Sequence, residues 1–220
     1  RYFSVPTDWF TQPHSIAEKN RLYIESATDL CAQAARKAMT RADCSPDSID
    51  YIVYINTTGI ATPSIDARLI NVLGLRHDIR RTPIWGLGCA GGVAALSHAY
   101  HYLLGHPNDT VLVVCAELCG LTFLADDFSR SNLVASALFG EGAAAAIIRN
   151  SPEIDGLRLM GTNSRFYPDS LDVMGWNVVE AGLQVIFAQR IPDIVAAHAR
   201  KDLGSFLESH ELTFDDIDQF

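Results

Sequence analysis

The sequence predicts an α/β fold with a mainly parallel sheet, because apolar strands alternate with helical segments and one segment is repeated. Residues 51–55 and 110–116 are short apolar runs bounded by polar turns, which is typical of buried strands. Between residues 15 and 39, apolar side chains recur every three or four positions, which predicts a helix before the first strand. Strands that alternate with helices imply βαβ units.

Further elements follow from local signals along the chain. A short helix is expected at residues 64–73 and a longer one at residues 91–104. The alanine-rich residues 143–148 are expected to form a third strand. Residues 179–208 are interpreted as mostly helical, with an interruption near Pro192.

The repeated segment occurs at residues 45–51 and again at residues 213–220. At a constant offset of 168, the first copy matches the second at four positions, and each copy follows an alanine-rich segment. The matching residues are Ser45, Asp47, Ile49 and Asp50 with Thr213, Asp215, Ile217 and Asp218. Either this is chance, since such turns are common, or the fold is duplicated and its second half has barely begun.

Composition excludes several functional classes. The chain has 220 residues, of which 26 are acidic and 17 basic, and the net charge of −9 argues against nucleic acid as a partner. Its longest apolar runs are far shorter than the roughly 20 residues that span a bilayer, so no membrane span is expected. The five cysteines are odd in number and lack C-x-x-C spacing, which favours reduced thiols and a cytoplasmic location.

Cys89 is the strongest candidate for a catalytic residue. It lies in Gly86-Leu-Gly-Cys-Ala-Gly-Gly92, where an apolar segment turns into a predicted helix. The glycines permit a tight turn, and the helix dipole favours a thiolate by about 1 kcal/mol. Strong activation would need a histidine partner, and none of the seven histidines has a context that suggests one. The alternative is an ordinary buried cysteine in a packing turn.

Gly140-Glu141-Gly142 is a second notable segment. It lies directly before the alanine-rich strand and suits a close approach of two backbones. Walker spacing and its lysine are absent, so it is no phosphate loop. The pattern by itself favours a tight turn into a core strand.

Taken together, the sequence resembles the thiolase superfamily and, within it, the type III polyketide synthases, the chalcone and stilbene synthase family. It is more similar to bacterial than to plant members. The segments that carry the resemblance are Gly88–Gly92, Val113–Glu117 with Leu121–Phe123, Ala137–Ala143, and Gly175–Leu183 followed by Ile191-Pro192.

The resemblance implies a thiolase-like αβαβα layered fold made of two similar halves. Residues 1–150 would form the amino-terminal half with the nucleophilic cysteine, and residues 151–220 the incomplete start of the second half. The family's catalytic histidine and asparagine, and the basic residues that hold coenzyme A phosphates, are expected outside this sequence. We therefore expect a chain truncated at both ends, and inactive in polyketide synthesis by itself.

The resemblance also implies an activity and its residues. The full enzyme would be an acyltransferase that loads an acyl group from acyl-CoA onto Cys89 and extends it by decarboxylative condensation with malonyl-CoA. It would be a homodimer that uses coenzyme A thioesters as substrates and needs no cofactor and no metal.

The substrate-binding residues that the resemblance implies are Phe139, Cys119, Thr122, Trp176, Val185 and Thr62. Phe139 would be the gatekeeper between the coenzyme A tunnel and the cavity. Val185 stands where plant enzymes have a second gatekeeper phenylalanine, so the cavity mouth would be wider here. Thr62 would lie on a loop that reaches the partner subunit's cavity, and the other three would line the cavity.

Two other functions remain open at this point. One is an initiation-type β-ketoacyl synthase acting on acyl carrier protein, although the net charge of −9 does not suggest a basic docking patch for an acidic carrier. The other is a non-catalytic thiolase-like protein retained for binding or dimerisation.

Overall fold

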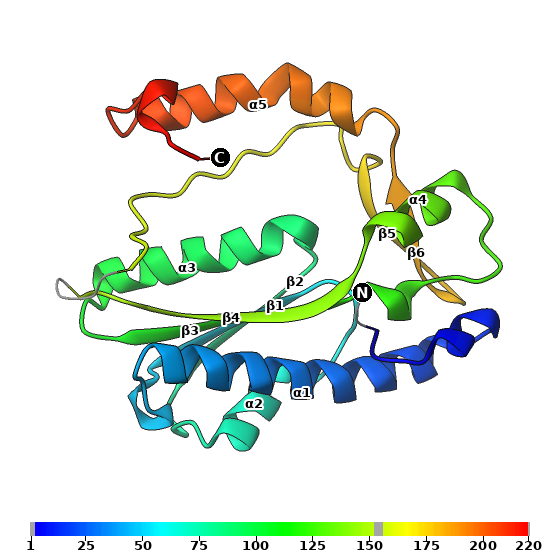
Figure 1. Ribbon diagram of the computed structural model, residues 1–220, viewed down its shortest axis with the longest axis horizontal. Coiled ribbons are helices and arrows are strands. Elements are labelled where there is room, and N and C mark those ends of the chain that lie inside the picture. Colours follow the sequence, from blue (N-terminus) through cyan, green and yellow to red (C-terminus); the bar gives the residue numbers. More distant parts are fainter. Residues whose placement is uncertain (1–2, 152–155, 220) are drawn as a thin grey trace.

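In the computed structural model, which describes residues 3–151 and 156–219, helices cover both faces of a four-stranded sheet (Figure 1). The sheet has the order β2-β1-β3-β4, so the two predicted buried strands lie at its centre. Strands β2 and β3 run parallel to β1, and β4 runs antiparallel to β3. The strand bounds are β1 Tyr51–Asn56, β2 Arg80–Trp85, β3 Thr110–Leu118 and β4 Glu141–Arg149.

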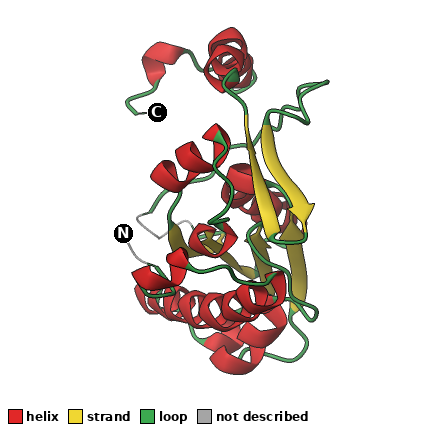
Figure 2. Cartoon of the chain, turned by 90° about the vertical axis from the view of Figure 1, so that its right-hand side faces the viewer, coloured by secondary structure: helices red, strands yellow, loops and turns green. Residues whose placement is uncertain are grey.

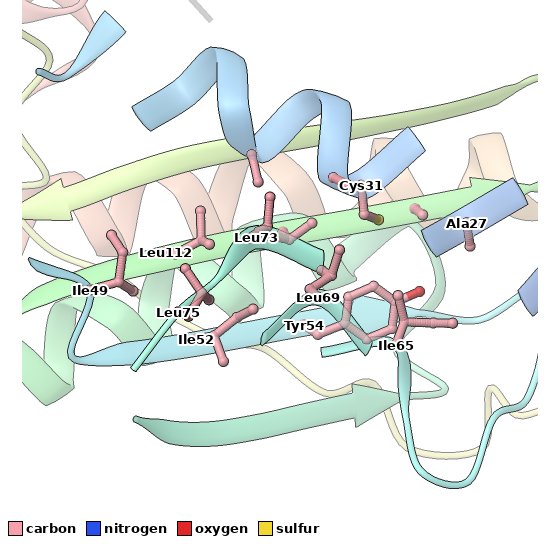
Figure 3. Close-up of a cluster of buried hydrophobic side chains, with 14 of the residues drawn as sticks. Ala27, Cys31, Ile49, Ile52, Tyr54, Ile65, Leu69, Leu73, Leu75 and Leu112 are labelled. Carbon is pink, nitrogen blue, oxygen red and sulfur yellow. The ribbon is translucent and has the colours of Figure 1, made fainter. Parts of the chain in front are cut away.

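Alternate side chains of β1 pack into two separate cores. Ile52 and Tyr54 face α1 (Ile16–Arg41) and α2 (Ile65–Leu73), where Figure 3 shows them among other buried apolar side chains. Val53 faces α3 (Gly91–Gly105) on the opposite side of the sheet. Successive side chains of a strand point to opposite faces of the sheet. Helices packed against both faces therefore give the helix–sheet–helix layers.

The predicted helices form for identifiable reasons. The Ser15 side chain caps α1 by accepting a hydrogen bond from Glu18 N at 3.2 Å. Gly74 ends α2 with a left-handed φ of +67°. A Cβ added at Gly91 would lie 3.2 Å from Ile55 Cδ1, so this glycine lets the start of α3 approach the sheet closely.

The interpretation of residues 179–208 as mostly helical is wrong over its first part. Strands β5 (Met174–Val179) and β6 (Gly182–Phe187) form an antiparallel hairpin, and α5 begins only at Ile191 and ends at Glu208. Figure 2 shows the hairpin as a ribbon beside the main body. Gly182 adopts a φ of +134° at the turn, and β-branched residues on both sides favour strands over a helix. Pro192 lies in the first turn of α5, where proline is tolerated.

Strand β2 was not predicted, because it is an exposed edge strand without a continuous apolar run. It contains Pro83 in register with Tyr54 of β1. Proline is tolerated at such an edge, where its missing N–H need not donate to a neighbouring strand.

The repeated segment has the same local structure in both copies. A 3₁₀ turn at Pro46–Ser48 follows α1, and another at Phe214–Asp216 follows α5. The two turns differ by the same 168 positions as the sequence match. This agreement supports a duplicated fold, whereas the proposed division at residue 150 stays a prediction.

Within residues 3–151 and 156–219, no helix is both long and apolar enough to cross a membrane.

Candidate active site

Cys89 lies on a turn that depends on glycine. It is the middle residue of the 3₁₀ turn Gly88–Ala90, which joins the end of β2 to the start of α3. Gly86 and Gly88 have φ values of +92° and +54°, a region that other residues rarely adopt. This geometry leaves the Cys89 side chain exposed at the helix start, so the alternative of an ordinary buried cysteine does not hold.

A cavity of about 250 Å³ lies at the same end of the sheet as the Cys89 turn. Five of the six predicted substrate-binding residues line it. They are Cys119, Thr122, Phe139, Trp176 and Val185. Thr62 is exposed and lies outside the described lining of the cavity, as does Cys89.

The five predicted lining residues come from three separate elements. Cys119 and Thr122 belong to the 3₁₀ turn Cys119–Thr122 that follows β3. Phe139 caps the end of α4 (Arg130–Leu138). Trp176 and Val185 are cross-strand partners in the β5–β6 hairpin. The hairpin therefore forms one wall of the cavity.

The Phe139 ring is held between two aromatic rings of the hairpin. Its centroid lies 6.3 Å from that of Trp176 and 6.0 Å from that of Phe187, both in edge-to-face geometry. Such pairs are favourable beyond the area they bury. They fix the orientation of Phe139 at the cavity wall.

Cys119 is the thiol that faces the cavity, and it is protonated at neutral pH. Burial, with smaller contributions from the neighbouring Glu117, Cys89 and Glu141, raises the pKa of Cys119 to about 12. The electrostatic interaction with Cys89 places the two thiols in the same region. All five cysteines are free, and the protonated Cys119 thiol adds a small, weakly polar surface to the cavity lining.

Two partly buried glutamates bind the backbone near the cavity. Glu117 accepts hydrogen bonds from Thr58 Oγ1 at 2.7 Å and from Thr57 N at 3.2 Å. Glu141 Oε2 accepts from Ser4 N at 2.5 Å, which ties the amino-terminal segment to the start of β4. Burial raises the pKa of both carboxyl groups, although these hydrogen bonds oppose the shift.

Glu141 explains why residue 120 is glycine. A Cβ at Gly120 would lie 2.3 Å from Glu141 Oε1, so a larger residue would displace this carboxyl group. A Cβ at Gly140 or Gly142 would meet nothing within 4 Å, so the expected close approach of two backbones at this segment is wrong, and the segment is a turn into β4.

No histidine lines the cavity in the described part of the chain. On α3, the His101 ring bonds to the Ser97 carbonyl at 2.8 Å and is exposed. Residues 3–151 and 156–219 also contain no cluster of three or more histidine, cysteine or acidic side chains that could hold a metal ion.

Sequence analysis missed three aromatic residues of the cavity wall. Phe3 and Phe10 come from the amino-terminal segment, and Phe123 follows the 3₁₀ turn of Cys119. The rings of Phe3 and Phe10 are 5.1 Å apart, and those of Phe10 and Phe123 are 6.0 Å apart. More than 100 residues separate Phe10 from Phe123, and no sequence motif links them.

Comparison with known proteins agrees with this architecture. The family model of the chalcone and stilbene synthases, N-terminal domain, matches residues 9–152. The 1,3,6,8-tetrahydroxynaphthalene synthase of Streptomyces peucetius subsp. caesius is 39% identical over 223 residues, which cover 99% of this chain and 58% of that protein. A relative from Bacillus subtilis is 38% identical over 232 residues, covering all of this chain and 64% of the relative.

Solved structures agree as well. The crystal structure of 1,3,6,8-tetrahydroxynaphthalene synthase from Streptomyces coelicolor A3(2), a bacterial type III polyketide synthase, superposes with a TM-score of 0.94 at 28% identity. The match covers 99% of this chain and 62% of that one. The present chain thus spans about three fifths of the length of these relatives.

The layered α/β fold and the exposed cysteine beside an apolar cavity define a thiolase-like protein. The chain belongs to the chalcone and stilbene synthase family, and its relatives are type III polyketide synthases. Family membership decides against the β-ketoacyl synthase alternative.

Proposed function

We propose that the protein is an acyltransferase of the type III polyketide synthase class. In this proposal, Cys89 accepts an acyl group from an acyl-CoA, and the acyl chain is then extended with malonyl-CoA. The observation that carries the proposal is the exposed Cys89 on its glycine-framed turn, at the end of the sheet where the apolar cavity lies. The names of relatives, among them a phloroglucinol synthase of Pseudomonas fluorescens, are consistent with it.

The loading step is a thioester exchange. The Cys89 thiolate attacks the carbonyl carbon of the acyl-CoA, and a new carbon–sulfur bond forms as the bond to coenzyme A breaks. Coenzyme A leaves as a thiolate and takes up a proton from solvent. Because Cys89 lies at the start of α3, the positive end of the helix dipole favours the attacking thiolate.

The extension step needs groups that stabilise negative charge. Loss of carbon dioxide from malonyl-CoA generates an enolate, which attacks the acyl-Cys89 carbonyl and forms an oxyanion. In the family that this chain resembles, a histidine and an asparagine carry these roles. Both lie outside the segment of the family that this chain matches.

The cavity would hold the growing chain. Phe139 would be the gatekeeper, while Cys119, Thr122, Trp176 and Val185 would contact the acyl group. We further propose a cytoplasmic homodimer in which Thr62, exposed on its loop, reaches the cavity of the partner subunit.

Release of coenzyme A tests the loading step. The chain is incubated with an acyl-CoA, and free coenzyme A is quantified by chromatography. We expect release of at most one equivalent, loss of release in Cys89→Ser, and its retention in the matched control Cys119→Ser. Equal release by wild type and Cys89→Ser would reject the proposal.

A further inference from the structure

A closed ring of hydrogen bonds lies directly before the Cys89 turn. Trp85, the last residue of β2, donates from indole Nε1 to Gly59 O at 3.1 Å, and Asn56 Nδ2 donates to the same carbonyl at 2.6 Å. Gly86 N in turn donates to Asn56 O at 3.4 Å. Both lone pairs of the Gly59 carbonyl are therefore used, and the ring joins the end of β1 and its following loop to the glycine that begins the Cys89 turn.

The Cys89 turn does not fix its own orientation. Gly86 and Gly88 have φ values of +92° and +54°, and glycine reaches other conformations at similar cost. A Cβ at either residue would meet nothing within 4 Å, so neighbouring side chains do not confine the backbone on that side. The Cys89 side chain is itself exposed. The position of the thiol therefore depends on what holds the two ends of the turn.

The two ends are held in different ways. At the end of the turn, Gly91 starts α3 in close contact with β1, since a Cβ there would lie 3.2 Å from Ile55 Cδ1. At its beginning, the turn depends on the hydrogen-bonded ring, in which Trp85 supplies the link from β2. The Trp85 side chain is 49% exposed and lies outside the lining of the 250 Å³ cavity. Its hydrogen bond can therefore be removed without opening the core.

We infer that Trp85 is a positioning residue for Cys89. Its indole N–H, through Gly59 O, holds the beginning of the turn so that the thiol stays at the start of α3. There the positive end of the helix dipole favours the thiolate, an effect that falls off within the first turn of a helix. This inference rests on the proposed function in taking Cys89 as the nucleophile. It assigns a role to a half-exposed tryptophan that does not touch the reacting atoms.

The test is the rate at which acyl-Cys89 forms in Trp85→Phe, followed by mass spectrometry in single-turnover reactions with excess acyl-CoA. Phenylalanine keeps an aromatic ring but has no N–H. A hydrogen bond of typical net strength shifts an equilibrium by roughly two- to tenfold, so we expect the maximal rate to fall by about that factor. The acyl-CoA concentration that gives half the maximal rate should not change, because Trp85 does not line the cavity.

Two matched variants make the comparison specific. In Trp85→His, the Nε2–H of the ring can take the place of the indole N–H, so the maximal rate should recover when it is measured above the ordinary pKa of histidine. Val93→Ala is the control, because Val93 is 68% exposed on α3 and carries no hydrogen-bonding group; its rate should equal that of wild type. Equal rates in wild type and Trp85→Phe, or the same loss in Trp85→Phe and Trp85→His, would overturn the inference.

Hydrogen exchange of the Gly86 amide separates this inference from the proposed function. This amide closes the ring through Asn56 O, so it should exchange roughly two- to tenfold faster in Trp85→Phe than in wild type or Trp85→His. If wild type forms no acyl-Cys89 but this exchange is still accelerated, the proposed function fails and the positioning role stands. Unchanged exchange in Trp85→Phe would overturn the positioning role whether or not Cys89 is acylated.

Discussion

Thr58 and Glu117 join the ends of the two central strands beside the candidate active site. The Thr58 hydroxyl donates to Glu117 Oε2 at 2.7 Å and accepts from Leu118 N at 2.9 Å. Thr58 follows β1 and Glu117 lies at the end of β3, so one buried hydroxyl connects neighbouring strands.

This connection predicts the effect of Thr58→Val. The variant keeps the shape of the side chain but leaves Leu118 N without its partner and removes one of the hydrogen bonds to the Glu117 carboxylate, which should lower the free energy of unfolding by about 1–3 kcal/mol. Urea unfolding measures the difference. Thr40→Val, at an exposed position of α1, is the matched control, and equal stability of the two variants would contradict the prediction.

Glu117 should also make stability depend on pH. Burial raises the pKa of this carboxyl group above its ordinary value. Between the ordinary pKa and the folded-state pKa, the folded protein therefore binds more protons than the unfolded chain. Its contribution to stability is present below the ordinary glutamate pKa and is lost as the pH rises through the folded-state pKa. The stability of wild type relative to Glu117→Gln should therefore fall as the pH is raised. A constant or rising difference in urea titrations would refute this assignment.

Gly59 allows Tyr23 to pack against the loop after β1. A Cβ at this position would lie 2.2 Å from Tyr23 Cγ, and the Tyr23 ring is buried. We expect Gly59→Ala to lower the free energy of unfolding by about 1–3 kcal/mol through overpacking. Gly92→Ala, whose added methyl group meets nothing within 4 Å, should be neutral or slightly stabilising. Thermal unfolding of both variants measures the difference in stability. Equal stability of the two variants would contradict the prediction, because it would mean that Tyr23 moves aside without cost.

Cys89 should be the fastest of the five thiols to react with iodoacetamide. It is exposed, whereas Cys31 is buried and Cys44, Cys115 and Cys119 are partly buried. Burial also raises the pKa of Cys31, Cys115 and Cys119, which lowers their thiolate fractions. Peptide mapping after brief labelling gives the order of reaction, and faster modification of Cys31, Cys44 or Cys119 would contradict this expectation.

The sequence identified the elements whose apolar pattern follows from the core. Strand β1 is buried at every position, and β3 is buried over its first five residues, so both appear as continuous apolar runs. The helix expected from residue 179 onward is wrong over β6, because this strand is short and only partly buried. Strand β2, with two arginines and Pro83 at the edge of the sheet, has no apolar run to detect.

The residues of the candidate site also differ in whether the sequence could predict them. Cys89 could be found because its turn needs glycines at neighbouring positions, and this leaves a pattern in the sequence. Phe10 and Phe123 could not, because they meet only in the folded chain and each alone is an ordinary apolar residue. The role of Thr62 depends on a second subunit and stays a prediction.

The measurement that tests the central claim most directly is mass spectrometry of the chain after incubation with an acyl-CoA. The account predicts one added acyl group, located on the peptide that contains Cys89, removed by hydroxylamine, and absent from Cys89→Ser. An acyl group on Cys119 or another residue, or an unchanged yield in Cys89→Ser, would contradict the assignment of Cys89 as the nucleophile.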